Sequence, residues 1–223
     1  EAAIIRRFLA EKEATIRRSL YQALLRLAYT VDGQRTLLRI WEGRWAAFDL
    51  PLSEGDYIDL ACEMALRNMP GSDTILTATL VRTQNPDRRR RFEFLLPALS
   101  PEQAVRDACF EQLKQPQNRA REPWVASALG YLHHPLRGDA SIPYLAPSLD
   151  LIEEIQQTGD IFFPAAWLQN TLGSYALPEA ATIVRDFLQR RSDLSPNLRN
   201  KVLQAADGLF RAEKTGAGEE VDG

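Results

Sequence analysis

SPEQAVRDACFEQL, at residues 100–113, carries the signals of a helix start one after another. Ser100 is placed to cap the helix, Pro101 stands at the first helical position, and Gln103 can complete a capping box with the serine. Comparable starts and stops recur along the chain, and no two runs show the alternation and tight turn of a strand hairpin. The sequence therefore predicts an all-α protein.

Helical patterns extend upstream of this stretch. Residues 1–27 read as one long helix with apolar residues spaced by three or four, at Ile16, Leu20, Leu24 and Leu27. Ser53 is expected to cap the next helix, whose buried face comprises Tyr57, Ile58, Ala61, Cys62, Ala65 and Leu66. Segment 72–85 is rich in residues that favour strands, but its apolar residues fall at helical spacing. A helix capped by Ser72 or Asp73 is expected there.

Downstream, the same pattern predicts five further helices, at residues 122–132, 146–159, 164–175, 177–191 and 195–212. In the last of them a single buried stripe is expected, made of Leu198, Val202, Ala205 or Ala206, and Leu209. Short amphipathic helices separated by short breaks are typical of a helical solenoid. We expect an α-superhelix of antiparallel helix pairs, like HEAT and armadillo arrays, as one domain over residues 1–213, followed by a flexible tail at 214–223.

Composition excludes some classes of partner. The 223 residues carry 27 basic and 30 acidic side chains, so the net charge of -3 gives no reason to expect nucleic acid. No apolar run approaches the roughly 20 residues needed to cross a bilayer. Cys62 and Cys109 are expected as reduced thiols. Because the chain begins without Met and is helical from its start, we expect a piece of a longer protein, and its cellular location stays unknown.

His133 and His134 invite a metal-site interpretation that their geometry opposes. Neighbouring residues of a helix project about 100° apart, and Pro135 ends the helix there. The spacings HExxH, Cx2C and Hx3H are absent. The pair is therefore expected at a helix C-terminus, where imidazoles donate to free carbonyls and suit the helix dipole when charged.

Arg88–Arg91 could similarly indicate a phosphate site, but four successive arginines spread around a helix rather than forming a strip. A solvated turn with salt bridges is expected instead. No GxSxG elbow occurs, and carboxylates such as Glu153 and Glu154 are expected on exposed helical faces. Spacing alone indicates a helical scaffold with no visible catalytic apparatus.

Four stretches are less generic than the rest: FLLPALS (94–100), NRAREPWVASALGYLHHPLR (118–137), IPYLAPSLDLIEEIQQTGDIFFPAAWL (142–168) and KVLQAADGLFRA (201–212). Together they resemble the C-terminal helical domain of bacterial zinc metallopeptidases of the aminopeptidase N type, over about residues 85–213. In that family a β domain and a thermolysin-like catalytic domain come first. The helical domain arches over the catalytic cleft and restricts access to peptides.

The resemblance implies a non-catalytic part of an exopeptidase that removes N-terminal residues from peptides. It implies no metal or cofactor in this part, because the family's zinc ligands and catalytic glutamate have no counterpart here. Its implied partners are the catalytic domain of the same polypeptide and peptide substrates. From another class, a free-standing HEAT-like scaffold for protein interaction stays open as the alternative.

The resemblance also suggests where a wall of the chamber would lie, at residues 119–137 and in the loop 158–167. The candidate wall residues are Arg119, Arg121, Glu122, Arg137 and Asp160. An arginine suits a peptide carboxylate because its guanidinium is a planar fork. In the competing interpretation, Glu122 and Asp160 cap helices and pair with the arginines, while Trp124, Phe162, Phe163 and Trp167 pack between helices. Relatives often carry a basic residue after FFP, where this chain has Ala165 and Ala166.

Overall fold

The computed structural model describes residues 1–219, and for 216–219 it describes the backbone alone. The described residues form fourteen α-helices and two 3-10 helices and contain no strand, so the all-α prediction is confirmed. None of these helices has the length and apolarity needed to span a bilayer. Cys62 and Cys109 are both free thiols, as expected.

The chain divides into two compact units, Glu1–Pro101 and Glu102–Gly223. One superhelix can contain two such units, so a single domain over 1–213 stays a prediction, as does the superhelical arrangement itself. A flexible tail was expected over residues 214–223, but residues 214–219 continue the last helix, so that expectation is wrong for them. Residues 220–223 lie outside the described part of the chain.

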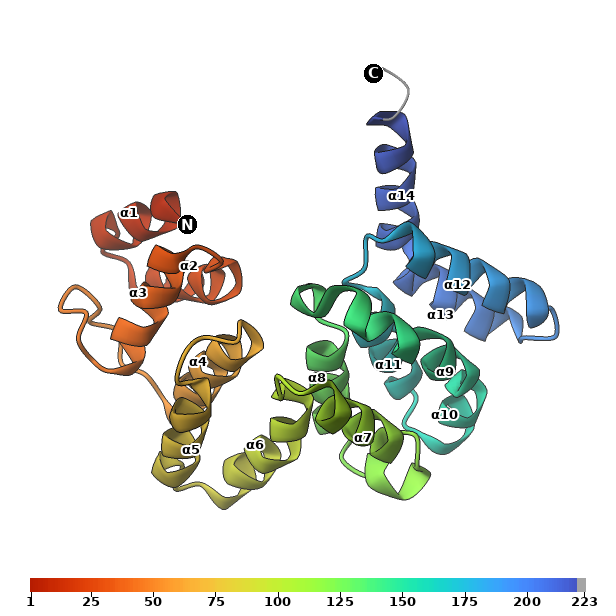
Figure 1. Ribbon diagram of the computed structural model, residues 1–223, viewed down its shortest axis with the longest axis horizontal. Helices are drawn as coiled ribbons and strands as arrows, with labels where there is room; N and C mark the ends of the chain where they lie inside the picture. The colour runs from red at the N-terminus through yellow and green to blue at the C-terminus, as the bar shows by residue number, and fades with distance from the viewer. Residues whose placement is uncertain (220–223) are drawn as a thin grey trace. The chain divides into compact units, whose positions relative to one another are not determined.

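The first unit is built from six helices, each packed on neighbours in the chain (Figure 1). They are α1 (Ala2–Ala10), α2 (Ala14–Leu27), α3 (Val31–Trp41), α4 (Glu54–Leu66), α5 (Ser72–Arg82) and α6 (Pro86–Leu99). The helix expected over segment 72–85 is confirmed as α5, although Gly71 rather than Ser72 or Asp73 occupies its N-cap. Ser53 caps α4 as predicted, in a capping box with Asp56.

The expectation of one long helix over residues 1–27 is wrong. The chain breaks between α1 and α2 because the Glu11 carboxylate accepts hydrogen bonds from the backbone N–H groups of Lys12 and Glu13. The predicted apolar stripe is only partly buried: Leu24 is enclosed, whereas Ile16 and Leu27 are exposed. The core between α1 and α2 is instead aromatic, with Phe8 stacked on Trp45 and Phe48.

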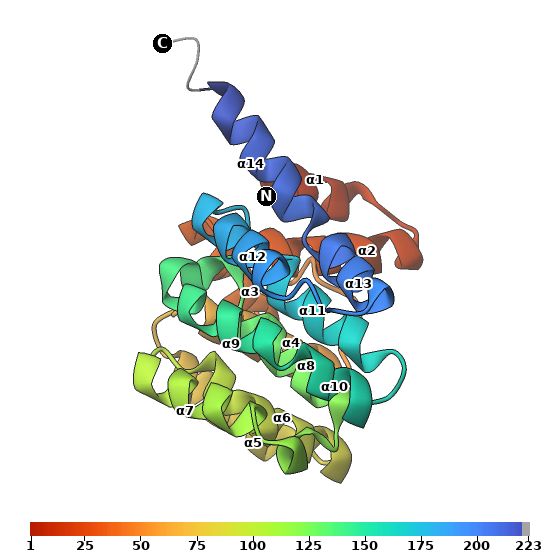
Figure 2. The ribbon, with the colours of Figure 1, turned by 90° about the vertical axis from the view of Figure 1, so that its right-hand side faces the viewer.

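The second unit holds the remaining helices (Figure 2). They are α7 (Gln103–Leu113), η1 (Pro116–Arg119), α8 (Glu122–Leu132), η2 (Pro135–Tyr144), α9 (Leu145–Asp150), α10 (Ile152–Thr158), α11 (Phe163–Leu172), α12 (Pro178–Arg190), α13 (Pro196–Ala205) and α14 (Asp207–Glu219). Helices α8 and α11 pack face to face. Gly130 allows this approach, since a Cβ there would lie 3.0 Å from Oδ1 of Asn170.

The capping box predicted at Ser100 does not form. Helix α7 begins at Gln103, its N-cap is Glu102, and no side chain caps it. The Gln103 amide donates instead to Oδ1 of Asp107 at 2.8 Å and to the Tyr144 hydroxyl at 2.7 Å. A side chain held by tertiary partners is not available to close a capping box. The capping-box pattern in the sequence is therefore overridden by tertiary contacts of Gln103.

Two helices expected to be continuous are each interrupted once. Segment 146–159 divides into α9 and α10, and segment 195–212 divides at Ala206 into α13 and α14. At the second break Asp207 starts the new helix. Its carboxylate is stabilised there by the positive end of the helix dipole. The predicted stripe is nevertheless confirmed as buried, at Leu198, Val202, Ala205, Ala206 and Leu209.

Candidate functional site

Arg119 lies at the centre of the region that the resemblance singles out. Its side chain is 4% exposed, and its guanidinium donates to Glu154 of α10 at 2.5 Å. It also donates to the carbonyl oxygens of Leu113 at 3.2 Å and Lys114 at 2.8 Å. The guanidinium lies 6.0 Å from the centre of the Trp167 ring. Arg119 therefore links η1 to α10 and α11. Of the two roles considered for it, contact with a peptide carboxylate or pairing and packing within the fold, these contacts match the second.

Two sequence-based details about this cluster are wrong. The partner of Arg119 is Glu154, not Glu122 or Asp160. Glu154 and Glu153 are half-buried rather than on exposed faces, because each pairs with an arginine that is distant in sequence: Glu154 with Arg119, and Glu153 with Arg191. A spacing of 35 residues between partners leaves no local pattern that could reveal them.

Glu122 and Asp160 meet in the loop that links α10 to α11. Oε1 of Glu122 accepts the backbone N–H of Asp160 at 2.8 Å, and the Asp160 carboxylate accepts the N–H of Phe162 at 2.9 Å. The loop is thus fixed by carboxylates that accept backbone N–H groups. This matches the interpretation in which Glu122 and Asp160 have capping roles. It displays Ile161 and Phe162 to solvent, 72% and 74% exposed. Phe162 does not pack between helices, whereas Phe163 and Trp167 do.

We expect Gly159→Ala to destabilise the protein by about 2 kcal/mol, because overpacking forces its neighbours to shift. A Cβ at Gly159 would lie 2.7 Å from Cδ1 of Phe163 and 2.9 Å from the Ile155 carbonyl oxygen. Gly208→Ala is the matched control: its Cβ would meet open space, and we expect a gain of about 0.5 kcal/mol in a helix. Urea unfolding followed by circular dichroism measures both. Equal effects of the two changes would contradict the close packing.

The other two candidate wall residues, Arg121 and Arg137, have different surroundings. Arg121 occupies the N-cap position of α8, is exposed, and lies 5.5 Å from the centre of the Trp124 ring. Arg137 is buried in η2, where burial and then Arg106 lower its pKa to about 10. None of these contacts tests a role in a chamber wall, which stays a prediction for all five residues.

The two histidines face different partners. His133 is buried at the C-cap of α8, and its Nδ1 lies 2.9 Å from the Tyr175 hydroxyl. His134 begins η2, and its Nδ1 accepts the Leu136 N–H at 3.2 Å. The prediction of a helix end is confirmed. The prediction that both rings donate to carbonyls is wrong, and burial lowers the pKa of His133 to about 3, so its ring is uncharged at the dipole end.

The tautomer of His133 decides which way its hydrogen bond with Tyr175 runs. Nδ1 and the tyrosine hydroxyl share one hydrogen bond, and either group can donate in it. The Ser141 hydroxyl beside them donates to the Leu132 carbonyl at 2.7 Å. In either tautomer Nε2 is buried and has no hydrogen-bond partner among the described residues. This ring is built into the core, with Phe110 and Tyr144 edge-on to it.

A polar cluster beside α7 was not predicted as a site. The Asp107 carboxylate accepts the Tyr144 hydroxyl at 2.7 Å and the Gln103 amide at 2.8 Å, which together lower its pKa. These residues border a cavity of about 520 Å³ that Phe110 and Pro143 also line. The sequence predicts only a capping role for Gln103, because its spacing gives no indication of these tertiary contacts.

No metal-binding geometry is found among the side chains that the structure describes, those of residues 1–215. Within this range, no three His, Cys, Asp or Glu side chains gather in a way that could hold an ion. His133 and His134 are bonded to separate groups, as described above. The expectation that this part of the protein holds no metal stays a prediction.

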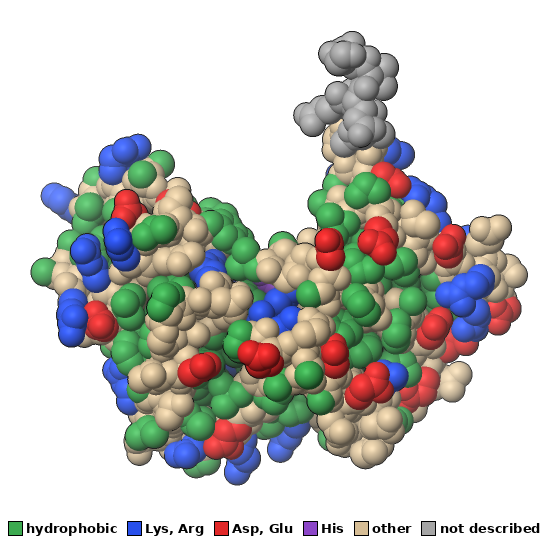
Figure 3. Space-filling view, viewed as in Figure 1, with side chains coloured by type: hydrophobic (Ala, Val, Ile, Leu, Met, Phe, Trp, Pro, Cys, Tyr) green, Lys and Arg blue, Asp and Glu red, His purple; other side chains and the backbone are tan. Residues whose placement is uncertain are grey.

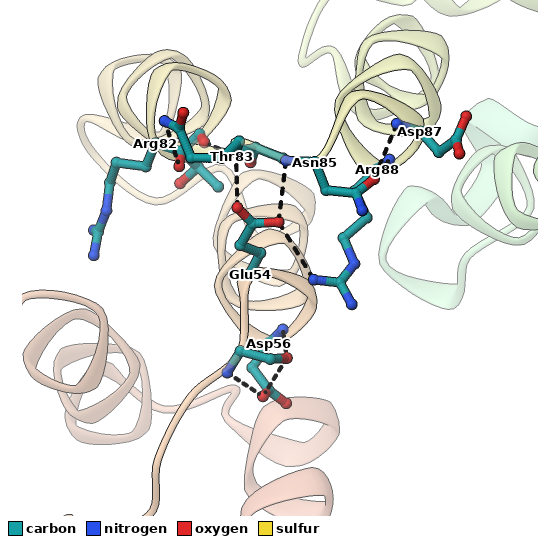
Figure 4. A network of polar contacts seen from close by, with 10 residues as sticks. Glu54, Asp56, Arg82, Thr83, Asn85, Asp87 and Arg88 are labelled. Atoms are coloured by element: carbon teal, nitrogen blue, oxygen red, sulfur yellow. Dashed lines mark hydrogen bonds and ion pairs between the residues drawn. The ribbon is translucent and has the colours of Figure 1, made fainter.

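Residues 88–91 lie on the first turns of α6, so the expectation of a solvated turn there is wrong. The ion pairs that the sequence predicts are confirmed at three of the four arginines. Arg88 pairs with Glu54 at 3.3 Å, Arg89 with Glu93 at 3.2 Å, and Arg90 with Asp87 at 2.5 Å. The Glu54 carboxylate also accepts the backbone N–H of Gln84 at 2.7 Å, so it joins α4 to the α5–α6 turn (Figure 4). Acidic and basic side chains are interspersed over the face drawn in Figure 3.

We expect Asp59→Asn to stabilise the protein by about 1–2 kcal/mol at pH 7.5. Burial raises the pKa of Asp59, Arg91 lowers it, and Asp56 and Glu63 raise it, so that the net value is about 6. Because the folded-state pKa lies above the unfolded value, ionisation destabilises the fold as the pH rises from about 4 to 6. Urea midpoints at pH 4 and 7.5 test this. A gain of the same size at both pH values would contradict it.

Comparisons with known protein families and with curated protein sequences gave no match to this chain. What the structure itself defines is the fold class, which is all-helical over the described residues.

Proposed function

We propose that this chain is the C-terminal helical domain of a zinc-dependent aminopeptidase of the aminopeptidase N type. In this role it encloses the chamber of the active site and limits which peptides reach it. The domain itself carries no catalytic residue and holds no metal. Its partners are the catalytic domain of the same polypeptide and the peptides that enter the chamber.

The observation that supports this proposal is that three of the four resembling stretches, 118–137, 142–168 and 201–212, are joined by side-chain contacts in the second unit. Arg119 pairs with Glu154, and Nε1 of Trp167 donates to the Ser148 carbonyl at 3.0 Å. Lys201 then links the last stretch by donating to Gln156 at 2.8 Å. The distinctive residues thus support a helical framework rather than a reaction, as a chamber-enclosing domain requires.

The reading frame upstream of Glu1 tests the proposal most directly. An HExxH motif a few hundred residues before Glu1, with a further glutamate downstream of it, is the expected result. An upstream frame without these zinc ligands would overturn the proposal and favour a free-standing interaction scaffold.

A second test uses the purified chain. We expect less than one tenth of an equivalent of zinc by elemental analysis after dialysis, and no cleavage of aminoacyl reporter substrates. The full-length protein, assayed alongside, is expected to cleave the same substrates in a chelator-sensitive manner. Zinc-dependent cleavage by residues 1–223 alone would contradict a non-catalytic domain.

A further inference from the structure

A groove of about 540 Å³ lies among the last three helices of the second unit. Helix α14 contacts both α12 and α13 and starts beside them (Figure 2). Each of the three helices contributes residues to the lining of the groove. Its lining residues come at helical spacing from each helix: Arg185, Leu188, Gln189, Arg199, Leu203, Phe210 and Lys214. The groove contains none of the residues considered above for the chamber wall.

The floor of the groove is apolar. Leu188 is nearly enclosed, Phe210 is half-buried, and Leu203 is 39% exposed. The Phe210 ring is kept in place by the Arg185 guanidinium, which lies 5.3 Å from its centre. Such a floor offers apolar contact area to a ligand and gives little to a small hydrated anion.

The rim of the groove is positively charged. Arg185 is paired with Glu213 at 3.0 Å, so its charge is compensated. Arg199 donates to the Leu188 carbonyl at 3.0 Å, which fixes its position without neutralising it. Lys214 is exposed, and no ion pair of its ammonium group is present among the described side chains. No carboxylate lines the groove, so two cations flank the apolar floor.

We propose that this groove binds an acidic amphipathic segment of a partner protein. An apolar anchor of the segment packs on Leu203 and Phe210, and flanking Asp or Glu side chains pair with Lys214 and Arg199. Facing helices that present apolar residues at i and i+4 are suited to receive a helix of this kind. The charge of the rim selects the acidic partner, and the apolar floor excludes a purely electrostatic ligand.

Nucleic acid fits the groove less well. Only one aromatic side chain lines it, and its ring is already covered by Arg185, so bases find no stacking surface. The inference does not depend on the proposed function, because it uses only the geometry and charge of α12, α13 and α14.

Fluorescence anisotropy with the full chain and labelled synthetic peptides tests the inference. The probe is a 15-residue helical peptide with Leu at i, i+4 and i+7 and Glu at the flanking positions. One control peptide has Lys in place of Glu, and another has Ser in place of Leu. We expect saturable binding of the acidic Leu peptide, weakened at least fivefold in each control and by raising NaCl from 50 to 300 mM.

Two substitutions in the protein locate the binding. Lys214→Glu is expected to weaken the acidic peptide about fivefold, the size of one charge reversal at an exposed site. Leu203→Ser is expected to weaken it by a similar factor without changing the salt dependence. Both positions are exposed, so helix content by circular dichroism should be unchanged. Arg6→Glu, an exposed charge reversal in the first unit, is the matched control and should leave the affinity as it is.

No saturable binding of the acidic peptide would overturn the inference. Equal loss in Lys214→Glu and Arg6→Glu would also overturn it, because it would show a response to net charge alone. If the Ser peptide or a single-stranded oligonucleotide bound more tightly than the acidic Leu peptide, the inference would also be overturned, because the groove would then prefer a polyanion without apolar anchors.

Discussion

Trp167→Ala should cost about 4 kcal/mol of stability, the largest loss we expect from one truncation. Trp167 is fully buried, and three groups depend on its indole. Its Nε1–H satisfies the Ser148 carbonyl at 3.0 Å, its ring packs edge-on against Phe163 with centroids 6.0 Å apart, and Arg119 lies over it. Alanine would leave a cavity and an unsatisfied carbonyl together.

Urea unfolding by circular dichroism measures the loss, and hydrogen exchange shows where it falls. We expect faster exchange across residues 102–219 than in the unmodified chain. Phe162→Ala removes an aromatic ring five residues away that is 74% exposed, so it should change stability by less than about 0.5 kcal/mol. A similar loss of unfolding free energy in both variants would show that Trp167 contributes no more to the stability of the second unit than an exposed aromatic ring does.

Helix positions were predictable from sequence where their signals are local. The Ser53 cap and the stripe from Leu198 to Leu209 involve residues three or four apart, and the structure confirms both. Breaks inside long apolar patterns were missed, as at Glu11 and Ala206. A break of that kind depends on one side chain bonding the backbone or on a change of packing direction, and neither alters the apolar spacing.

The candidate site was harder to predict than the fold for the same reason. The sequence indicates Arg119 as a candidate wall residue, but its ion-pair partner Glu154 is 35 residues away and was expected on an exposed face. Gln103 carried the signal of a capping box and is used instead by Asp107 and Tyr144. The groove of α12–α14 combines residues from three helices, so no single stretch of sequence reveals it.

His133 should make the stability of the protein strongly dependent on pH. Burial lowers the pKa of its imidazole to about 3, whereas an unfolded chain titrates near 6.5. The folded state therefore binds fewer protons, and the stability from a neutral His133 is fully present above pH 6.5 and lost as the pH falls toward 3. We expect this one group to remove about 3 kcal/mol between pH 7 and pH 4, where the slope is about 1.4 kcal/mol per pH unit.

The matched variants are His133→Gln and His134→Gln. A glutamine amide can hydrogen-bond the Tyr175 hydroxyl as donor or acceptor but cannot gain a proton. The stability difference between the unmodified chain and His133→Gln should therefore change by about 3 kcal/mol from pH 7 to pH 4. His134 is only half-buried and bonds the Leu136 N–H, so His134→Gln should keep the steep pH dependence. Urea midpoints at five pH values measure each curve. Parallel curves for the unmodified chain and His133→Gln would mean that the ring reaches solvent and titrates freely, because a buried imidazole whose Nε2 lacks an acceptor cannot hold a proton at no cost.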